Sequence, residues 1–225
     1  MYCVRMARPR GYKQRTFEIN SRLKEEYSVV KCALDHENPF QLLVATILSA
    51  QCTDVRVNMV TPKLFDAFPT PEDMALATQT QVEQLVSSTG FFRNKAKNII
   101  GMSQKLLSDF GGEVPEDIED LVSLPGTGRK TANVIRHVAF GLPGIPVDTH
   151  VGRLVNRLKI TNETDPVKVE YELNELIPPE EGGDFSLRLI EHGRKVCDAK
   201  KPKCDVCFLN DICPSAFKII KKKKS

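Results

Sequence analysis

Four cysteines close to the C-terminus carry the clearest chemical signal in the sequence. Cys197, Cys204, Cys207 and Cys213 lie within seventeen positions, with the spacing C-x6-C-x2-C-x5-C. Four thiols this close together can bind an iron–sulfur cluster, bind a zinc ion or form two disulfides. The unequal spacing favours a loop wrapped around an iron–sulfur cluster, because the thiolates must reach four separate irons. Zinc sites with four cysteines usually pair two short C-x2-4-C segments, and only Cys204 and Cys207 form one.

The N-terminus bears on the disulfide alternative. Residues 1–5, MYCVR, lack the apolar stretch of a secretion signal, so we expect a reducing, prokaryotic-like cytoplasm in which disulfides are rare.

No apolar run reaches the roughly 18 residues of a membrane span. We therefore expect no membrane partner. The isolated cysteines Cys3, Cys32 and Cys52 are interpreted as ordinary thiols.

Two glycines in a short turn indicate a second site. Residues 121–140, LVSLPGTGRKTANVIRHVAF, contain two helical patterns joined by Pro125-Gly126-Thr127-Gly128. Glycines let another molecule approach the backbone closely, and the amide groups at the start of the second helix attract an anion. Such a hairpin can hold a nucleic-acid phosphate without reading sequence. The alternative is a tight turn between two helices, without a ligand.

Lys130 lies in the first turn of the second helix, two residues after Gly128. The positive end of the helix dipole disfavours a cation there, which makes the neutral and nucleophilic amine more available. A lysine at this place is equally suited to contact a phosphate. Its position alone leaves both roles open.

Asp148 directly precedes the apolar-periodic run of residues 151–158. An aspartate before such a run is typical of a helix N-cap. The functional alternative is a carboxylate directed at Lys130. Spacing alone favours the cap.

The elements that must position these residues are helices. Asn38-Pro39, Thr70-Pro71 and Asp165-Pro166 each place a capping side chain before a proline at the first helical position. Residues 40–50, FQLLVATILSA, are apolar nearly all round, which predicts a helix buried in a bundle, and Asp54 is expected to cap the next helix. No period-two strand pattern is present. The sequence predicts an all-α protein of roughly ten short helices.

The charge of the chain is unevenly distributed. The net charge is +3, but residues 1–31 carry eight Lys and Arg against three Glu, and residues 195–225 carry nine Lys against three Asp. Residues 32–194 therefore have a charge of −8. Basic ends around an acidic middle predict a localised surface for a polyanion. The run Lys221–Lys224 is interpreted as a solvated tail.

Three segments in this order resemble the helix-hairpin-helix DNA glycosylase superfamily and, within it, the endonuclease III family of glycosylases and AP lyases. They are LPGTGRKTANVI, the aspartate of VDTHVGRL eighteen residues after Lys130, and the four-cysteine pattern. The resemblance extends from about residue 16 to 215 and includes LLVATILSAQCTD at 42–54 and STGFFRNKAKNI at 88–99. It implies base excision repair as the process in which the protein acts.

The resemblance implies two α-helical lobes flanking a DNA-binding cleft. Residues 32–142 would form a six-helix barrel that contains the helix-hairpin-helix. Residues 1–31 and 143–225 would form a discontinuous iron–sulfur lobe, in which Cys197, Cys204, Cys207 and Cys213 hold a [4Fe-4S] cluster. Both basic ends then belong to one lobe.

Specific residue roles follow from the same resemblance. Lys130 corresponds to the lysine that forms a Schiff base, and Asp148 to the catalytic aspartate. Gln51 matches the residue that fills the gap left by a flipped nucleotide. Phe91 stands where a loop residue, commonly aliphatic, enters beside the opposite base, so the sequence departs from the family pattern there. The expected phosphate contacts are Pro125, Gly126, Thr127, Gly128, Arg129, Lys200, Lys201 and Lys203.

The implied activity is excision of oxidised pyrimidines from double-stranded DNA, followed by strand cleavage 3′ to the abasic site through a lysine Schiff base. A monomer associated with the nucleoid through DNA is expected. One alternative is a monofunctional adenine glycosylase, which lacks the lysine and places a catalytic Glu in the buried helix, whereas residues 42–50 contain no carboxylate. The other is a non-catalytic DNA-binding or electron-transfer protein, against which the presence of both Lys130 and Asp148 argues.

Overall fold

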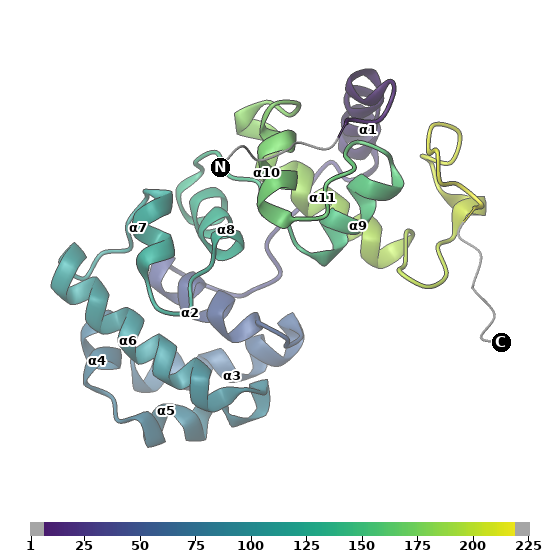
Figure 1. Cartoon of the computed structure of the whole chain (residues 1–225). Coiled ribbons are helices and arrows are strands. Elements are labelled where there is room, and N and C mark those ends of the chain that lie inside the picture. The colour runs from purple at the N-terminus through teal and green to yellow at the C-terminus, as the bar shows by residue number, and fades with distance from the viewer. Residues whose placement is uncertain (1–6, 219–225) are drawn as a thin grey trace. The chain divides into compact units, whose positions relative to one another are not determined.

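The structure is a computed structural model that describes residues 7–218. The regular structure of this part consists of eleven α-helices and three short 3-10 helices, without a β-strand (Figure 1). The prediction of an all-α fold is therefore confirmed. Cys3 and the lysine run 221–224 lie outside the described residues.

The chain divides into two compact units, each with a hydrophobic core of its own. One unit runs from Cys32 to Leu142 and is called the middle unit below. The other, called the terminal unit, joins the chain up to Lys31 with the chain from Pro143 onward. These bounds coincide with the two lobes expected from the resemblance.

The middle unit is built around one largely apolar and buried helix. Its elements are α2 (Pro39–Ser49), α3 (Asp54–Ala67), α4 (Pro71–Leu76), α5 (Gln79–Val86), the 3-10 helix η1 (Ser87–Thr89), α6 (Phe92–Phe110), α7 (Ile118–Ser123) and α8 (Arg129–Phe140). In α2, Phe40 and every residue from Leu42 to Leu48 are buried, and the helix packs against α3, α6 and α8. The predicted buried helix is thus confirmed. Its side chains are apolar on nearly all faces because other helices pack against several of them.

The terminal unit is assembled from both ends of the chain. Its elements are α1 (Tyr12–Glu26), α9 (Thr149–Arg157), α10 (Pro166–Asn174), the 3-10 helix η2 (Pro179–Glu181), α11 (Gly182–Lys195) and the 3-10 helix η3 (Cys204–Val206). Helix α11 packs against both α9 and α1. Ile19, Leu154 and Leu189, one from each of these helices, are fully buried in the shared core. Burial of these side chains holds the N-terminal helix to the C-terminal half.

Helix starts follow the capping signals in the sequence. Asn38 accepts a hydrogen bond from the Gln41 N–H at 2.9 Å, and Thr70 accepts one from the Asp73 N–H at 3.2 Å. Asp165 accepts from two amides at the start of α10, at 3.0 Å each. One expected cap is wrong: α3 is capped by Thr53, whose Oγ1 accepts from the Arg56 N–H, and Asp54 is the first helical residue.

Within residues 7–218, no helix combines the length and the apolar character that crossing a bilayer requires.

Candidate functional site

The glycine-containing turn joins α7 to α8 in the middle unit. Leu121 and Leu124 anchor α7 in the core, and the Thr127 N–H closes the turn by donating to the Leu124 carbonyl at 3.0 Å. The Thr127 side chain is also buried. Thr127 therefore directs its polar groups into the protein, unlike the exposed Gly126 and Gly128 on either side of it.

The two glycines of this turn meet different requirements. Gly126 has φ +79°, and a Cβ at this position would lie 2.9 Å from the Asn98 Cβ, so both its conformation and its surroundings demand glycine. Gly128 has φ −91°, and a Cβ there would meet nothing within 4 Å. The fold explains Gly126, whereas the open space above Gly128 is available to a ligand that approaches the backbone.

Lys130 occupies the first turn of α8 and is exposed. Ala132, Asn133 and Ile135 form the buried face of this helix. The N-cap Gly128 provides no side chain to cap the first-turn amides, which leaves them suited to an anion. Arg129 lies beside Lys130 and forms an ion pair with Glu119, at 3.7 Å. An exposed amine at the uncapped start of a helix fits both a nucleophile and a phosphate contact.

Gln51 and Phe91 both have backbone conformations that are uncommon for their residue types. Gln51 follows α2 with φ +53°, and Phe91 precedes α6 with φ +48°. Both residues are exposed, Phe91 to 66%. An exposed aromatic residue with a left-handed backbone contributes little to the stability of the fold, because its backbone is strained and its side chain stays in water. Such a position is typical of a residue that contacts something outside the protein.

Asp148 is the N-cap of α9 in the terminal unit. Its Oδ1 accepts a hydrogen bond from the Val151 N–H at 2.8 Å, which confirms the capping role expected from spacing. One carboxylate oxygen serves the cap, and the side chain is half-buried. The cap does not exclude a second role for the other oxygen. Lys130 and Asp148 belong to different units, so their action on one nucleotide stays a prediction.

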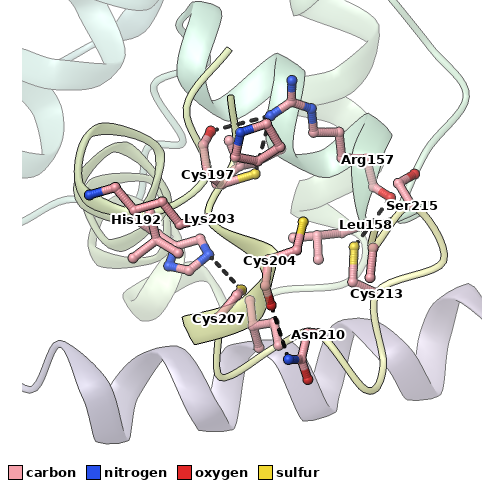
Figure 2. A pocket seen from close by; sticks show the side chains of 15 residues that line it. Arg157, Leu158, His192, Cys197, Lys203, Cys204, Cys207, Asn210, Cys213 and Ser215 are labelled. Carbon is pink, nitrogen blue, oxygen red and sulfur yellow. Dashed lines mark hydrogen bonds between the residues drawn. The ribbon is translucent and has the colours of Figure 1, made fainter. Parts of the chain in front are cut away.

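The four cysteines of the C-terminal motif line one pocket in the terminal unit. All four are free thiols, and their sulfur atoms surround the same space (Figure 2). Burial raises the pKa of Cys207 to about 11 and also raises that of Cys213, so a positively charged group is needed to keep these two thiols ionised at neutral pH. Within residues 7–218, no three His, Cys, Asp or Glu side chains are arranged about a single metal ion. Four thiols that line one pocket are the kind of donor set that an iron–sulfur cluster takes.

Two residues that the sequence analysis missed hold the cysteine loop. Arg157, at the end of α9, donates to the carbonyls of Asp198 and Ala199 at 2.7 Å each, and to the Cys197 Sγ at 3.3 Å. On the other side of the pocket, His192 Nε2 lies 3.4 Å from the Cys207 Sγ (Figure 2). Burial lowers the pKa of His192 to about 4, so this ring is neutral. Nothing in the sequence spacing connects these residues to the cysteines.

The three lysines between Cys197 and Cys204 lie on an exposed loop. The Asp198 carboxylate accepts from the Lys200 and Lys201 amides at 2.8 and 3.0 Å, and these bonds lower the pKa of Asp198. Lys203 donates to the Lys195 carbonyl at 3.1 Å. The loop therefore has a defined backbone, from which Lys200 and Lys201 extend into solvent.

Comparison with known proteins places this geometry in context. Residues 44–179 match the family model described as HhH-GPD superfamily base excision DNA repair protein, and residues 197–213 match the iron-sulfur binding domain of endonuclease III. Endonuclease III of Synechocystis sp. is 53% identical, over 91% of this chain and 94% of the relative. Endonuclease III of Bacillus subtilis is 48% identical, over 85% and 88%.

Solved structures agree with the sequence matches. A non-covalent endonuclease III–DNA complex and a trapped endonuclease III–DNA covalent intermediate each give a TM-score of 0.88 at 42% identity, covering 92% of this chain and 97% of theirs. A thermostable thymine-DNA glycosylase, 23% identical, gives a TM-score of 0.83 over 91% and 98%, and shows the shared fold.

Proposed function

The chain belongs to the endonuclease III family of the HhH-GPD base excision repair superfamily, and from this premise we propose how its residues perform the reaction. The protein is a bifunctional DNA glycosylase and AP lyase. It removes a damaged base and then cleaves the strand 3′ to the abasic site. One observation supports this assignment of the chemistry: the exposed Lys130 lies in the first turn of α8, which follows a glycine turn without a side-chain cap.

DNA is held through its backbone. The turn from Pro125 to Arg129 offers the first-turn amides of α8 to a phosphate, and the lack of a Cβ at Gly128 lets the phosphate approach. Lys200, Lys201 and Lys203 on the cysteine loop add positive charge for further phosphates. Phosphate contacts carry no sequence information, so the protein binds DNA with little dependence on the surrounding sequence.

The damaged nucleotide must leave the base stack, because its glycosidic bond is not accessible inside the duplex. Gln51 fills the space that the nucleotide vacates, and the Phe91 ring enters beside the opposite base. Their exposure and left-handed backbone conformations support these two roles. A phenyl ring can stack on the opposite base, which an aliphatic side chain cannot do.

Lys130 acts as the nucleophile. Its neutral amine forms a bond to C1′ of the deoxyribose while the glycosidic bond breaks, and the electron pair of that bond leaves with the base, which takes up a proton. The sugar ring then opens between C1′ and O4′, which gives an imine between C1′ and the lysine nitrogen. The Asp148 carboxylate stabilises the positive charge that develops on the sugar.

Strand cleavage follows from the imine. It acidifies the C2′ proton, and loss of that proton supplies the electrons that break the C3′–O bond and release the 3′ phosphate. Water then hydrolyses the imine and frees Lys130. Each of these steps uses side chains and water alone.

The protein carries a [4Fe-4S] cluster, in agreement with the matched iron-sulfur domain at residues 197–213. We assign Cys197, Cys204, Cys207 and Cys213 as its ligands, because they are the four thiols that line one pocket. The cluster supplies a rigid anchor for the loop that carries Lys200, Lys201 and Lys203. Arg157 supports the same loop from α9 through its bonds to the 198 and 199 carbonyls.

We further propose that the substrates are oxidised pyrimidines and abasic sites in double-stranded DNA. The protein would act as a monomer in a prokaryotic cytoplasm, associated with the nucleoid through DNA. The family membership and the basic ends of the chain support this part of the proposal.

A duplex containing one oxidised pyrimidine tests the function. The protein should release the base, cut the strand, and become covalently attached to the DNA when borohydride reduces the imine. Base release without trapping would indicate a monofunctional glycosylase. Binding without base release would indicate a non-catalytic protein, and either result would contradict the role of Lys130.

A further inference from the structure

Lys95 is the one buried lysine among residues 7–218, with 4% of its surface exposed. It lies in the first turn of α6, in the middle unit. No carboxylate of the described residues pairs with it, and burial lowers its pKa. A lone cation is expensive to bury, whereas a methionine of similar length would fill the same space without this cost. The ammonium group therefore requires a specific explanation.

The Lys95 ammonium donates two hydrogen bonds to backbone carbonyls from separate segments. One acceptor is the Leu48 carbonyl and the other is the Thr89 carbonyl, both at 2.8 Å. Leu48 lies in the last turn of α2, where carbonyls have no partner within the helix. Thr89 ends η1. A single nitrogen atom thus connects the end of α2 to the end of η1, about forty residues apart in sequence, and each of these ends leads into a loop.

These two loops carry the side chains that are proposed to enter the DNA. Gln51 is three residues beyond Leu48, and Phe91 is two residues beyond Thr89. The main chain of Lys95 strengthens the second connection, because its N–H donates to the Phe91 carbonyl at 3.1 Å. Lys95 itself is too deeply buried to contact DNA directly.

The backbone at both positions needs support of this kind. Cys52 N–H donates to the Ser49 carbonyl at 3.0 Å, and Ala50 has φ −56° and ψ 114°, so residues 49–52 form a type II turn. The third position of such a turn favours glycine, but here it is Gln51, at φ +53°. Phe91 is held in the same region of backbone space. Strained conformations persist only where the surrounding structure fixes them.

We propose that Lys95 is a positioning residue that fixes the Gln51 loop (residues 49–53) and the Phe91 loop (residues 87–91) relative to each other, so that both side chains enter the DNA together. Hydrogen bonds from a charged donor are stronger than those from a neutral donor. The two loops can therefore keep their geometry while the DNA is deformed. The inference rests on the proposed function, because it assumes that these two loops act on a flipped nucleotide.

The test compares base release from a duplex, which requires the nucleotide to be flipped out, with covalent trapping on single-stranded abasic DNA, which does not. Lys95→Met removes both hydrogen bonds, and Lys95→Arg keeps a buried charged donor. Met102→Ala is the matched control, since it removes a fully buried side chain from the same helix and leaves the two carbonyl bonds in place. Each protein is assayed for base release from a duplex and for borohydride trapping on single-stranded abasic DNA, where there is no partner strand to invade.

Lys95→Met should slow base release from the duplex by about tenfold or more, with trapping on single-stranded abasic DNA close to that of the unaltered protein. Lys95→Arg should recover part of the duplex activity, and Met102→Ala should lose stability without this selective loss. The proposal would be overturned if Lys95→Met lost activity equally on duplex and single-stranded DNA. It would also be overturned if the loss of duplex activity in all three variants were proportional to their loss of stability. If the methionine variant does not fold, Lys95→Gln, whose shorter and neutral side chain does not reproduce the two bonds of the ammonium group, takes its place and should show the same selective loss on duplex DNA.

Fluorescence separates this inference from the proposed function. The probe is a duplex with 2-aminopurine opposite a tetrahydrofuran abasic analogue, which the protein binds but cannot cleave. Binding by the unaltered protein should raise the fluorescence, because the 2-aminopurine is separated from the neighbouring bases that quench it. Lys95→Met should abolish most of this rise. An unchanged rise in the variant would contradict the role of Lys95, whereas failure of the unaltered protein to trap any abasic DNA would contradict the proposed function instead.

Discussion

Gly126 is packed against Asn98 so closely that a Cβ on the glycine would lie 2.9 Å from the Asn98 Cβ. Gly128, two residues later, faces open space. Gly126→Ala should therefore destabilise the protein by about 1–3 kcal/mol, since it adds a clash to a left-handed backbone. Gly128→Ala should cost less than about 1 kcal/mol in stability. Chemical denaturation measures both changes.

DNA binding should show the opposite order for the two variants. Gly128→Ala should weaken binding to an abasic-analogue duplex by about tenfold at moderate salt, because the new methyl group stands where a phosphate approaches. Folded Gly126→Ala should lose less. Normal DNA binding by Gly128→Ala would show that this segment is an interhelical turn without a role in binding phosphate.

Asp148 caps α9, so a substitution is needed that keeps the cap and removes the charge. Asn caps a helix about as well as Asp. Asp148→Asn should thus retain stability within about 1 kcal/mol and slow base release by about a hundredfold or more, because a neutral amide does not stabilise a cationic sugar. Asp165→Asn makes the same change at the cap of α10 and serves as the control. Equal activity of the two variants would leave Asp148 with a capping role only.

Local signals predicted much of this fold. Asn38, Thr70 and Asp165 cap their helices because capping depends on a few neighbouring atoms, and the apolar run of α2 is buried as its composition requires. The error at Asp54 is also local, because two adjacent residues could both cap and Thr53 has the extended backbone that a cap needs.

Other site features depend on the tertiary structure and have no sequence signal. Arg157 is 40 residues from the cysteine sulfur that it contacts, and Lys95 is 47 residues from the Leu48 carbonyl. Neither spacing follows a helical or strand period. The sequence likewise gives no signal for the left-handed conformations of Gln51 and Phe91, since neither residue type favours them.

Gln51 offers a test in which stability and activity change independently. Gln51→Gly removes the backbone strain of a left-handed residue, so the stability should stay within about 1 kcal/mol of the unaltered protein or rise. Base release from a duplex should nevertheless slow by about tenfold or more, because nothing fills the gap in the helix. Thermal unfolding and a single-turnover assay measure the two effects. A variant that keeps full activity would remove Gln51 from the DNA-contacting set.

Cys204→Ser tests the assignment of the cluster ligands. The unaltered protein should be yellow-brown, with about four irons per chain. The serine variant should lose iron and bind duplex DNA poorly, while trapping on single-stranded abasic DNA is affected less, because the cluster anchors a loop and takes no part in the chemistry. Cys32→Ser, outside the motif, should keep its iron. One zinc per chain and no iron in the unaltered protein would contradict the cluster.

The Lys130 amine forms the covalent bond to DNA in the proposed reaction, and borohydride trapping with the Lys130→Gln variant tests this role. Glutamine keeps much of the length and hydrogen bonding of lysine but has no nucleophilic amine, so no imine can form. Lys63→Gln, which changes an exposed lysine on α3, is the control and should trap normally. Lys130→Gln should form no covalent complex and cleave no strand, with binding to the damaged duplex largely intact. A covalent complex formed in normal yield by Lys130→Gln would contradict the role of Lys130 as the nucleophile.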